Sequence, residues 1–203
     1  MDFVVLLSFL TASITLTLMP GPDIVFVITE SLSNGVKQGI GITLGLVFGL
    51  LFHTLAASFG LSIILQNSSL AFQLLKILGG LYLFYLAYLS YKENSNQTPA
   101  SFQHKKPLYK LFVKGLFMNL LNPKVTLFFV AFFPKFIFSQ TISIPAQFST
   151  LGILFMLQAF LIFSLVSVFA SKLTLKNNSL KVQQGIKFFK SIIYFFLGIY
   201  III

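Results

Sequence analysis

Residues 16–23 read LTLMPGPD and interrupt an apolar segment that begins at Phe3. A second interruption, Asn122-Pro123-Lys124, stands inside another apolar segment. Each proline removes a backbone N–H and breaks the hydrogen-bond ladder of a helix. Pro22 and Pro123 are 101 residues apart, which is almost half the chain. A shift of the sequence by 101 residues aligns Asp23 of the first break with Lys124 of the second.

The apolar character of the chain predicts an all-α integral membrane protein with a single transporter domain over residues 1–203. Of its residues, 57% are hydrophobic and 9% are charged, and the mean hydropathy is +0.93. Soluble proteins carry about 25% charged residues, so this composition excludes a soluble enzyme. The apolar runs are too long for barrel strands and predict six helical spans of roughly 20 residues. They are Phe3–Met19 continuing brokenly to Ile28, Ile40–Leu65, Leu70–Tyr91, Gly115–Phe133, Pro145–Ala170 and the short Phe188–Ile203.

The two matching breaks divide the chain into half-repeats of about residues 1–93 and 108–203, joined by a linker over 94–107. Three spans per half is an odd number, so the halves insert with opposite orientation and form a 3+3 inverted repeat with broken first and fourth helices. Such breaks at matching positions indicate a transport site, and the breaks are expected to frame a polar cavity; ordinary proline kinks are the alternative. The expected transport residues are Pro20, Gly21, Pro22, Asp23, Asn122, Pro123 and Lys124.

The charges predict how the chain lies in the membrane and limit its partners. All fourteen basic residues are lysines, and eleven of them fall in the first, third and fifth expected loops. The positive-inside rule places these loops in the cytoplasm and both termini outside. Nucleic-acid binding would require a basic soluble face, which this pattern lacks. The chain has no cysteine, metal-ligand spacing or nucleotide-binding fingerprint, so no metal or cofactor is expected.

Charged side chains within the spans are functional candidates because they are costly in a bilayer. Asp23 is the leading residue for substrate contact and proton coupling, although its carboxylate could simply cap the following half-helix. Lys124 has three possible roles: pairing with Asp23, meeting a substrate carboxylate, or reaching the cytoplasmic surface. A loop residue such as Lys37 is the expected partner of Glu30.

The second span carries small residues and a histidine at every fourth position, which places them on one helix face: Gly41, Gly45, Gly49 and His53. Small residues at this spacing let two helices approach closely. The face serves either internal packing or a homo-oligomer. His53 is a possible proton-coupling residue, but hydrogen-bonded packing is favoured. Gly79 and Gly80 predict another closely packed helix, and Gln158 is expected to bond a neighbouring helix.

Several of these residues together resemble the LysE/RhtB translocator family over essentially the whole chain. They include Met19-Pro20-Gly21-Pro22-Asp23, the Gly45/Gly49/His53 series, Gly79-Gly80-Leu81-Tyr82-Leu83, Asn122-Pro123-Lys124 and Phe133-Pro134-Lys135-Phe136. The resemblance implies a bacterial inner-membrane protein that exports amino acids and related small molecules, driven by the proton gradient. It also implies that the two proline stretches form the transport core. The short last span departs from the family pattern.

The expected function is therefore export of an amino acid or a related zwitterion from the cytoplasm by proton antiport. The substrate carboxylate is expected to meet half-helix N–H groups or Lys124, and its ammonium to meet Asp23 or the carbonyls that the prolines free. Export of a cation or a toxic metabolite is the alternative within transport. A structural membrane subunit is the alternative from another class. A membrane-embedded enzyme is not expected, because the spans lack facing acid and base pairs.

Overall fold

The computed structural model describes residues 3–61, 69–92 and 107–172, together with isolated positions near the C-terminus. Every regular element in these ranges is a helix, which confirms the all-α class. In chain order they are α1 (Phe3–Leu18), α2 (Pro22–Asn34), α3 (Val36–Ala56), η1 (Ala57–Leu61), α5 (Ser69–Lys92), α6 (Leu108–Leu120), α7 (Pro123–Leu127), η2 (Phe128–Phe132), η3 (Phe133–Phe136) and α8 (Ile144–Lys172). Most of the expected sixth span and most of the linker lie outside the described residues.

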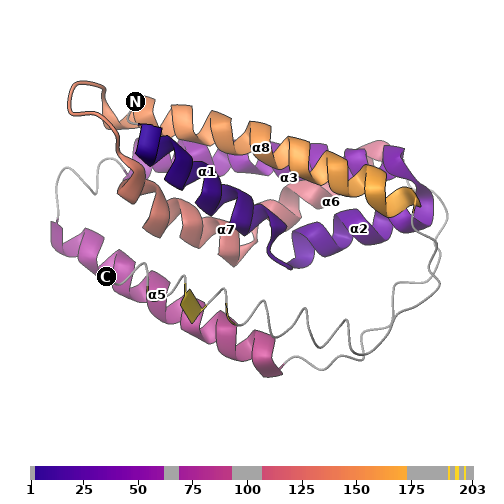
Figure 1. The fold of residues 1–203 in the computed structure, drawn as a ribbon, viewed down its shortest axis with the longest axis horizontal. Helices are drawn as coiled ribbons and strands as arrows, with labels where there is room; N and C mark the ends of the chain where they lie inside the picture. Colours follow the sequence, from indigo (N-terminus) through magenta and orange to yellow (C-terminus); the bar gives the residue numbers. More distant parts are fainter. Residues whose placement is uncertain are drawn as a thin grey trace.

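Both proline breaks bend their helices, as expected (Figure 1). The axes of α1 and α2 differ by 57°, and α6 differs from the segment Pro123–Phe136 by 48°. Within the described residues, Val36–Gly60 and α8 are long and apolar enough to cross a membrane, and each bent pair also qualifies as one span. The chain therefore holds up to four such spans in this part.

Two helices extend further toward the lysine-bearing end than the apolar pattern predicts. α2 continues to Asn34, and a single residue, Gly35, with a φ of 91°, joins it to α3. Lys37 therefore lies in the first turn of α3, and the expected first loop is almost absent. α6 begins at Leu108 and includes Lys114, which was expected at a loop edge. The apolar pattern marks the hydrocarbon region, whereas a helix continues into the polar interface where lysines reach water.

The glycine face of α3 packs against α6, so it serves internal packing. A Cβ on Gly45 would overlap the backbone carbonyl of Phe112. A Cβ on Gly49 would lie 2.7 Å from the side chain of Asn119. From the opposite helix, Gly115 faces the carbonyl of Ile42 just as closely. These contacts bring the two backbones together, in agreement with the expected role of small residues.

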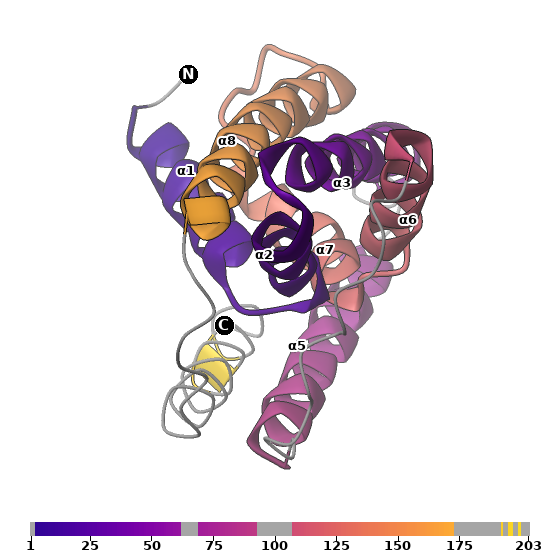
Figure 2. The same cartoon turned by 90° about the vertical axis from the view of Figure 1, so that its right-hand side faces the viewer.

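The helix α5 extends away from the other described helices and contacts them at η2 (Figures 1 and 2). Gly79 and Gly80 lie within α5. Their surroundings are outside what the structure describes, so their packing role stays a prediction.

A cluster of phenylalanine rings fills the bundle on the side of the breaks that faces the N-terminus. The ring of Phe9 on α1 lies 5.6 Å from that of Phe133 and 5.3 Å from that of Phe136. Phe155 on α8 lies 5.2 Å from Phe128, which continues the cluster across the bundle. Edge-to-face and stacked rings at these distances stabilise the packed core.

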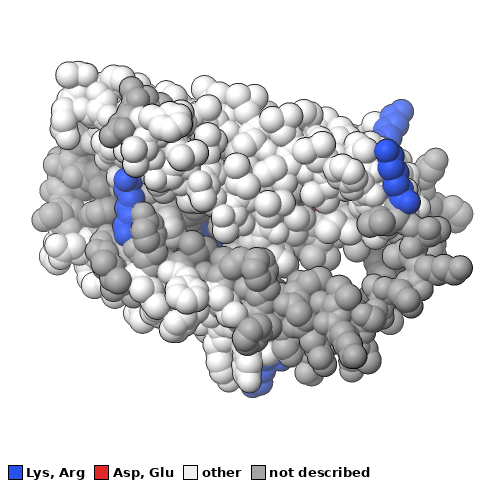
Figure 3. Space-filling view, viewed as in Figure 1, with Lys and Arg blue, Asp and Glu red and all other residues white. Residues whose placement is uncertain are grey.

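Large apolar side chains cover much of the outer surface of the described helices. Phe3 is 72% exposed and Phe169 is 65% exposed. On the face in Figure 3, the blue lysine side chains stand mainly near the edges of the molecule, and most of the described surface between them is uncharged. An apolar surface of this extent is typical of helices that contact lipid.

One buried amide fixes the turn between η3 and α8. Gln147 Oε1 accepts hydrogen bonds from the backbone N–H groups of Phe138 and Ser139, at 2.8 and 3.0 Å. Its Nε2 donates to the carbonyls of Ser139 and Ile142, at 2.9 and 2.7 Å.

We expect Gln147→Leu to lower the free energy of unfolding by about 1–3 kcal/mol, because it leaves these backbone groups without their partner. Limited proteolysis in detergent should then cut the segment 137–143 faster than in the wild type. Gln103→Leu, in the linker, is the matched control. Equal cleavage rates in both variants and the wild type would contradict this role of Gln147.

Candidate functional site

The two breaks meet through a buried ion pair between Asp23 and Lys124. The Lys124 Nζ lies 2.9 Å from Oδ2 and 3.2 Å from Oδ1 of Asp23. The side chains are 2% and 4% exposed, respectively. Of the three roles considered for Lys124, pairing with Asp23 is the one observed. The charged groups touch directly, so no hollow separates them, contrary to the expected polar cavity.

The ammonium of Lys124 also donates to two backbone carbonyls at the end of α1, those of Leu16 at 3.0 Å and Met19 at 3.3 Å. Within a regular helix, the carbonyl of residue 16 would bond the N–H of residue 20. Residue 20 is proline and has no N–H, so the Leu16 carbonyl is free to accept from Lys124. The first proline thus creates one wall of the site.

The start of α2 is built to hold a negative charge beside this ammonium. Gly21 is its N-cap, Pro22 follows at the first position, and no side chain caps the free N–H groups. Asp23 lies in the first turn, where the helix dipole favours a carboxylate. A Cβ on Gly21 would lie 2.7 Å from Asp23 Oδ1 and 3.2 Å from Lys124 Nζ, so glycine leaves the space that the pair occupies.

The second break is organised by Asn122, whose Oδ1 caps α7 by accepting from the Lys124 backbone N–H at 3.1 Å. Pro123 cannot donate to the Asn119 carbonyl four residues earlier. That carbonyl lies 3.3 Å from Nε2 of His53. Since a carbonyl can only accept, Nε2 carries the hydrogen. His53 also stacks on Phe129, with ring centroids 5.4 Å apart, so it has the favoured packing role.

Buried amides lie at the second break and on α8. As expected, Gln158 bonds another helix: its Nε2 donates to Thr17 Oγ1 at 3.0 Å. Three amide atoms are buried without a hydrogen-bond partner in the structure as described, and they belong to Asn119 (Oδ1), Asn122 (Nδ2) and Gln158 (Oε1). Such atoms cost free energy when they stay unpaired. Asn119 and Asn122 lie beside and within the second break, and Gln158 is hydrogen-bonded to Thr17 of α1.

The other buried acid has a neutral partner. Glu30 Oε1 accepts a hydrogen bond of 2.6 Å from Nδ2 of Asn34, and not from the expected Lys37. The reason is helical geometry, because residues four apart on α2 face each other. One turn earlier, Phe26 lies under Lys114 Nζ, which is 3.7 Å from its ring centroid.

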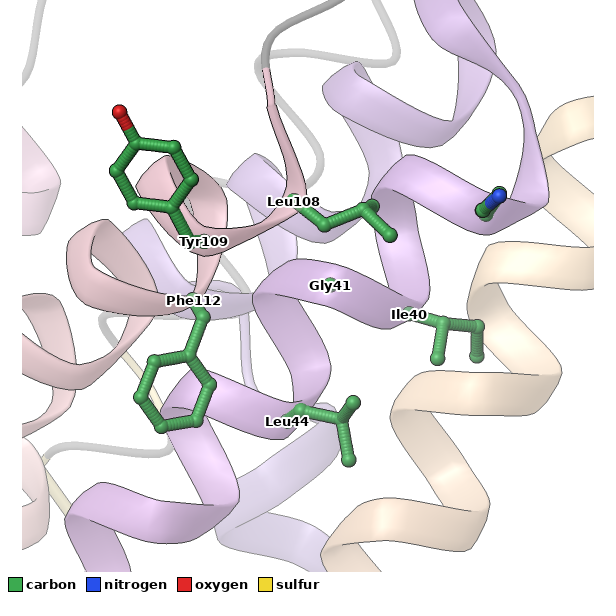
Figure 4. Close-up of a pocket in the computed structure, with 7 residues that line it drawn as sticks. Ile40, Gly41, Leu44, Leu108, Tyr109 and Phe112 are labelled. Carbon is green, nitrogen blue, oxygen red and sulfur yellow. The ribbon is translucent and has the colours of Figure 1, made fainter.

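A surface hollow of about 420 Å³ lies elsewhere, between the first turns of α3 and α6 (Figure 4). Its walls are apolar side chains from both helices, with Lys37 and Tyr109 at the margin. None of the residues of the two breaks lines it. An apolar surface hollow lacks the paired charges that would hold a zwitterion, so the ion pair remains the candidate site.

The structure brings four of the seven expected transport residues into contact: Gly21, Asp23, Asn122 and Lys124. The three prolines act through the backbone, by freeing carbonyls and starting helices. Asn122 acts through its side chain, which caps α7. The expectation named freed carbonyls without saying which. Loss of the proline N–H selects the Leu16 carbonyl, four residues before Pro20, which Lys124 contacts. The Asn119 carbonyl, four residues before Pro123, accepts instead from the Asn122 backbone N–H at 3.0 Å.

Comparisons with known proteins find a matching family model and several relatives. The model of the family described as LysE type translocator matches residues 14–203. An uncharacterized membrane protein of Vibrio cholerae is 32% identical over 153 residues, covering 75% of this chain and 74% of the relative. Leucine efflux proteins of Salmonella typhimurium and Salmonella typhi are each 30% identical over 131 residues, covering 64% of this chain and 62% of each relative. No solved structure matches.

The match to the family model includes both proline breaks, the end of α1 and the whole of α2 and α7. Family membership and the apolar helices together make this a multi-pass membrane protein of a transporter family. The chain belongs to the family of LysE type translocators.

Proposed function

We propose that this protein exports amino acids or related small zwitterions from the cytoplasm by proton antiport. The observation that carries the proposal is the buried Asp23–Lys124 pair, which joins two helix breaks 101 residues apart. A buried, oppositely charged pair matches the two charges of a zwitterion. The relatives named for leucine efflux make apolar amino acids the first substrates to test.

The proposed architecture is a six-helix 3+3 inverted repeat in the bacterial inner membrane, with both termini outside. Three features support it: the two breaks bend by similar angles, they contact each other, and three-span halves must insert with opposite orientation. The lysines of residues 92–114 and 172–190 then lie on the cytoplasmic side. The phenylalanine cluster closes the path from the pair to the outside, so export requires these rings to separate.

The geometry supports an exchange of partners on substrate binding. The substrate ammonium takes the place of the Lys124 ammonium at Asp23, and the released lysine receives the substrate carboxylate. The unpartnered Nδ2 of Asn122, two residues from Lys124, is a second donor for that carboxylate. Each buried charge keeps an opposite charge while the substrate is bound, which avoids the large cost of an isolated one in that step.

Proton coupling is assigned to Asp23 in this proposal. Protonation neutralises the carboxylate and removes its attraction for either ammonium, so the substrate leaves when a proton arrives from outside. His53 is the other candidate, but its Nε2 is engaged at the Asn119 carbonyl. The return step then moves the protonated carrier inward and delivers the proton to the cytoplasm.

Cells that are preloaded with leucine-containing dipeptides test the proposal, because hydrolysis raises the internal leucine concentration. We expect overexpression to increase leucine release, and Asp23→Asn to reduce the increase at least about tenfold, since the neutral amide lacks the charge that binds an ammonium. Export is measured in the medium over time, at matched membrane expression.

The control is Lys37→Gln, which removes an exposed charge far from the pair and should export like the wild type. Wild-type release from Asp23→Asn would remove Asp23 from the mechanism. If overexpression changes the release of no amino acid but confers resistance to an amine, the cation-export alternative is correct.

A further inference from the structure

We infer that the Lys124 ammonium occupies the binding site of the substrate ammonium. This site is a cage of oxygen atoms that accepts only primary ammonium groups. The inference rests on the proposed transport at this site and adds the class of substrate it selects. The cage consists of the Asp23 carboxylate, the Leu16 carbonyl and the Met19 carbonyl.

The number of acceptor groups, with the Asp23 carboxylate counted once, equals the number of donors of a primary ammonium. An alkylammonium ion has three N–H bonds and no acceptor. Lys124 Nζ finds an acceptor in each of three groups, at 2.9 Å (Asp23 Oδ2), 3.0 Å (Leu16) and 3.3 Å (Met19). All donors are used, and a buried carbonyl left without one would cost free energy.

This arrangement predicts which nitrogen groups are rejected. A secondary ammonium, as in proline or N-methylleucine, has one N–H fewer and leaves one acceptor unpaired. A quaternary ammonium, as in glycine betaine, has no N–H and is also larger than the space beside Gly21, where a single added Cβ would come within 3.2 Å of Nζ. Sites that hydrogen-bond a substrate N–H strongly reject analogues that lack it.

The same arrangement explains why the site is closed without substrate. The tethered lysine ammonium competes with any free amine for the cage, so the two breaks stay joined. A substrate displaces it only if it also offers a carboxylate to the released lysine. A simple amine has no carboxylate, so its binding would leave the released Lys124 ammonium without an anion, which costs free energy. The cage therefore selects zwitterions with a primary ammonium.

Chemical rescue of purified Lys124→Ala in detergent tests the cage directly. This substitution removes the equivalent of n-propylammonium from the site. We expect n-propylammonium chloride to raise the Tm of Lys124→Ala by roughly 5 °C at saturation, because a ligand that binds the folded state stabilises it. Tetramethylammonium chloride at the same concentration should produce no more change than sodium chloride.

Two further variants identify the site of rescue. Lys37→Ala, which removes an exposed lysine, should show no specific response to n-propylammonium. The double variant Asp23→Asn/Lys124→Ala should also lose the response, because the carboxylate of the cage is gone. An equal rise with both ammonium salts, or an equal rise in the double variant, would overturn the cage. If Lys124→Ala does not fold, the wild type carries the test through the transport arm.

In the transport arm, wild-type proteoliposomes loaded with unlabelled leucine take up external radiolabelled leucine by exchange in the presence of an external competitor. Unlabelled leucine should inhibit at least about tenfold better than N-methylleucine. Equal inhibition would overturn the selection of primary ammonium groups. Rescue by n-propylammonium without any leucine transport would support the ammonium cage and refute leucine as the substrate. The experiment therefore tests the cage and the proposed substrate separately.

Discussion

Lys124→Met is expected to lower the free energy of unfolding by about 3–5 kcal/mol, because it leaves the Asp23 carboxylate buried without its cation. The helix dipole of α2 and the free N–H groups at its start offset only part of this cost. The carbonyls of Leu16 and Met19 also lose their donor. The measurement is equilibrium unfolding in mixed micelles, followed by circular dichroism.

The reciprocal changes make this prediction specific. Asp23→Asn should cost less than Lys124→Met, because the ammonium keeps two backbone acceptors and gains an amide oxygen. The double variant Asp23→Asn/Lys124→Met should recover much of the lost stability, since no charge remains buried. A double variant as unstable as the sum of the single variants would show that the pair does not interact as the geometry implies.

Gly45→Val is expected to have the second large effect, because it separates the backbones of α3 and α6. The ideal Cβ position already overlaps the Phe112 carbonyl and lies 2.8 Å from the Leu116 amide. Backbone cannot move aside as a flexible side chain does, so we expect a loss of about 3 kcal/mol or more, at the upper end of overpacking effects. The yield of monodisperse protein in detergent and its Tm measure the loss.

Two other glycines provide a graded control for the packing of α3. Gly41→Ala meets the end of the flexible Leu108 side chain at 3.2 Å and should cost little. Gly60→Ala has no other atom within 4 Å and should leave stability unchanged. If Gly45→Val folds as well as Gly60→Ala, the close contact between α3 and α6 does not limit stability.

The sequence was sufficient for several elements of the fold. Proline positions located both helix breaks, since the loss of a backbone donor is a covalent property. The four-residue spacing of Gly41, Gly45 and Gly49 placed them on one face, because that spacing is inherent to the helix. The helix ends were harder to predict from the sequence. Lys114 was expected at a loop edge but lies within α6, because a lysine near the membrane interface is compatible with both helix and loop.

By itself, the sequence determined that the chain is an apolar, helical membrane protein, that two of its helices break, and that the breaks carry opposite charges. These properties follow from local chemistry, which acts over a few neighbouring residues. Only the tertiary structure decided that Asp23 and Lys124 touch, that the glycine face serves internal packing, and that the Leu16 and Met19 carbonyls complete an ammonium cage. Those outcomes depend on distances between segments far apart in the chain, and packing alone fixes such distances.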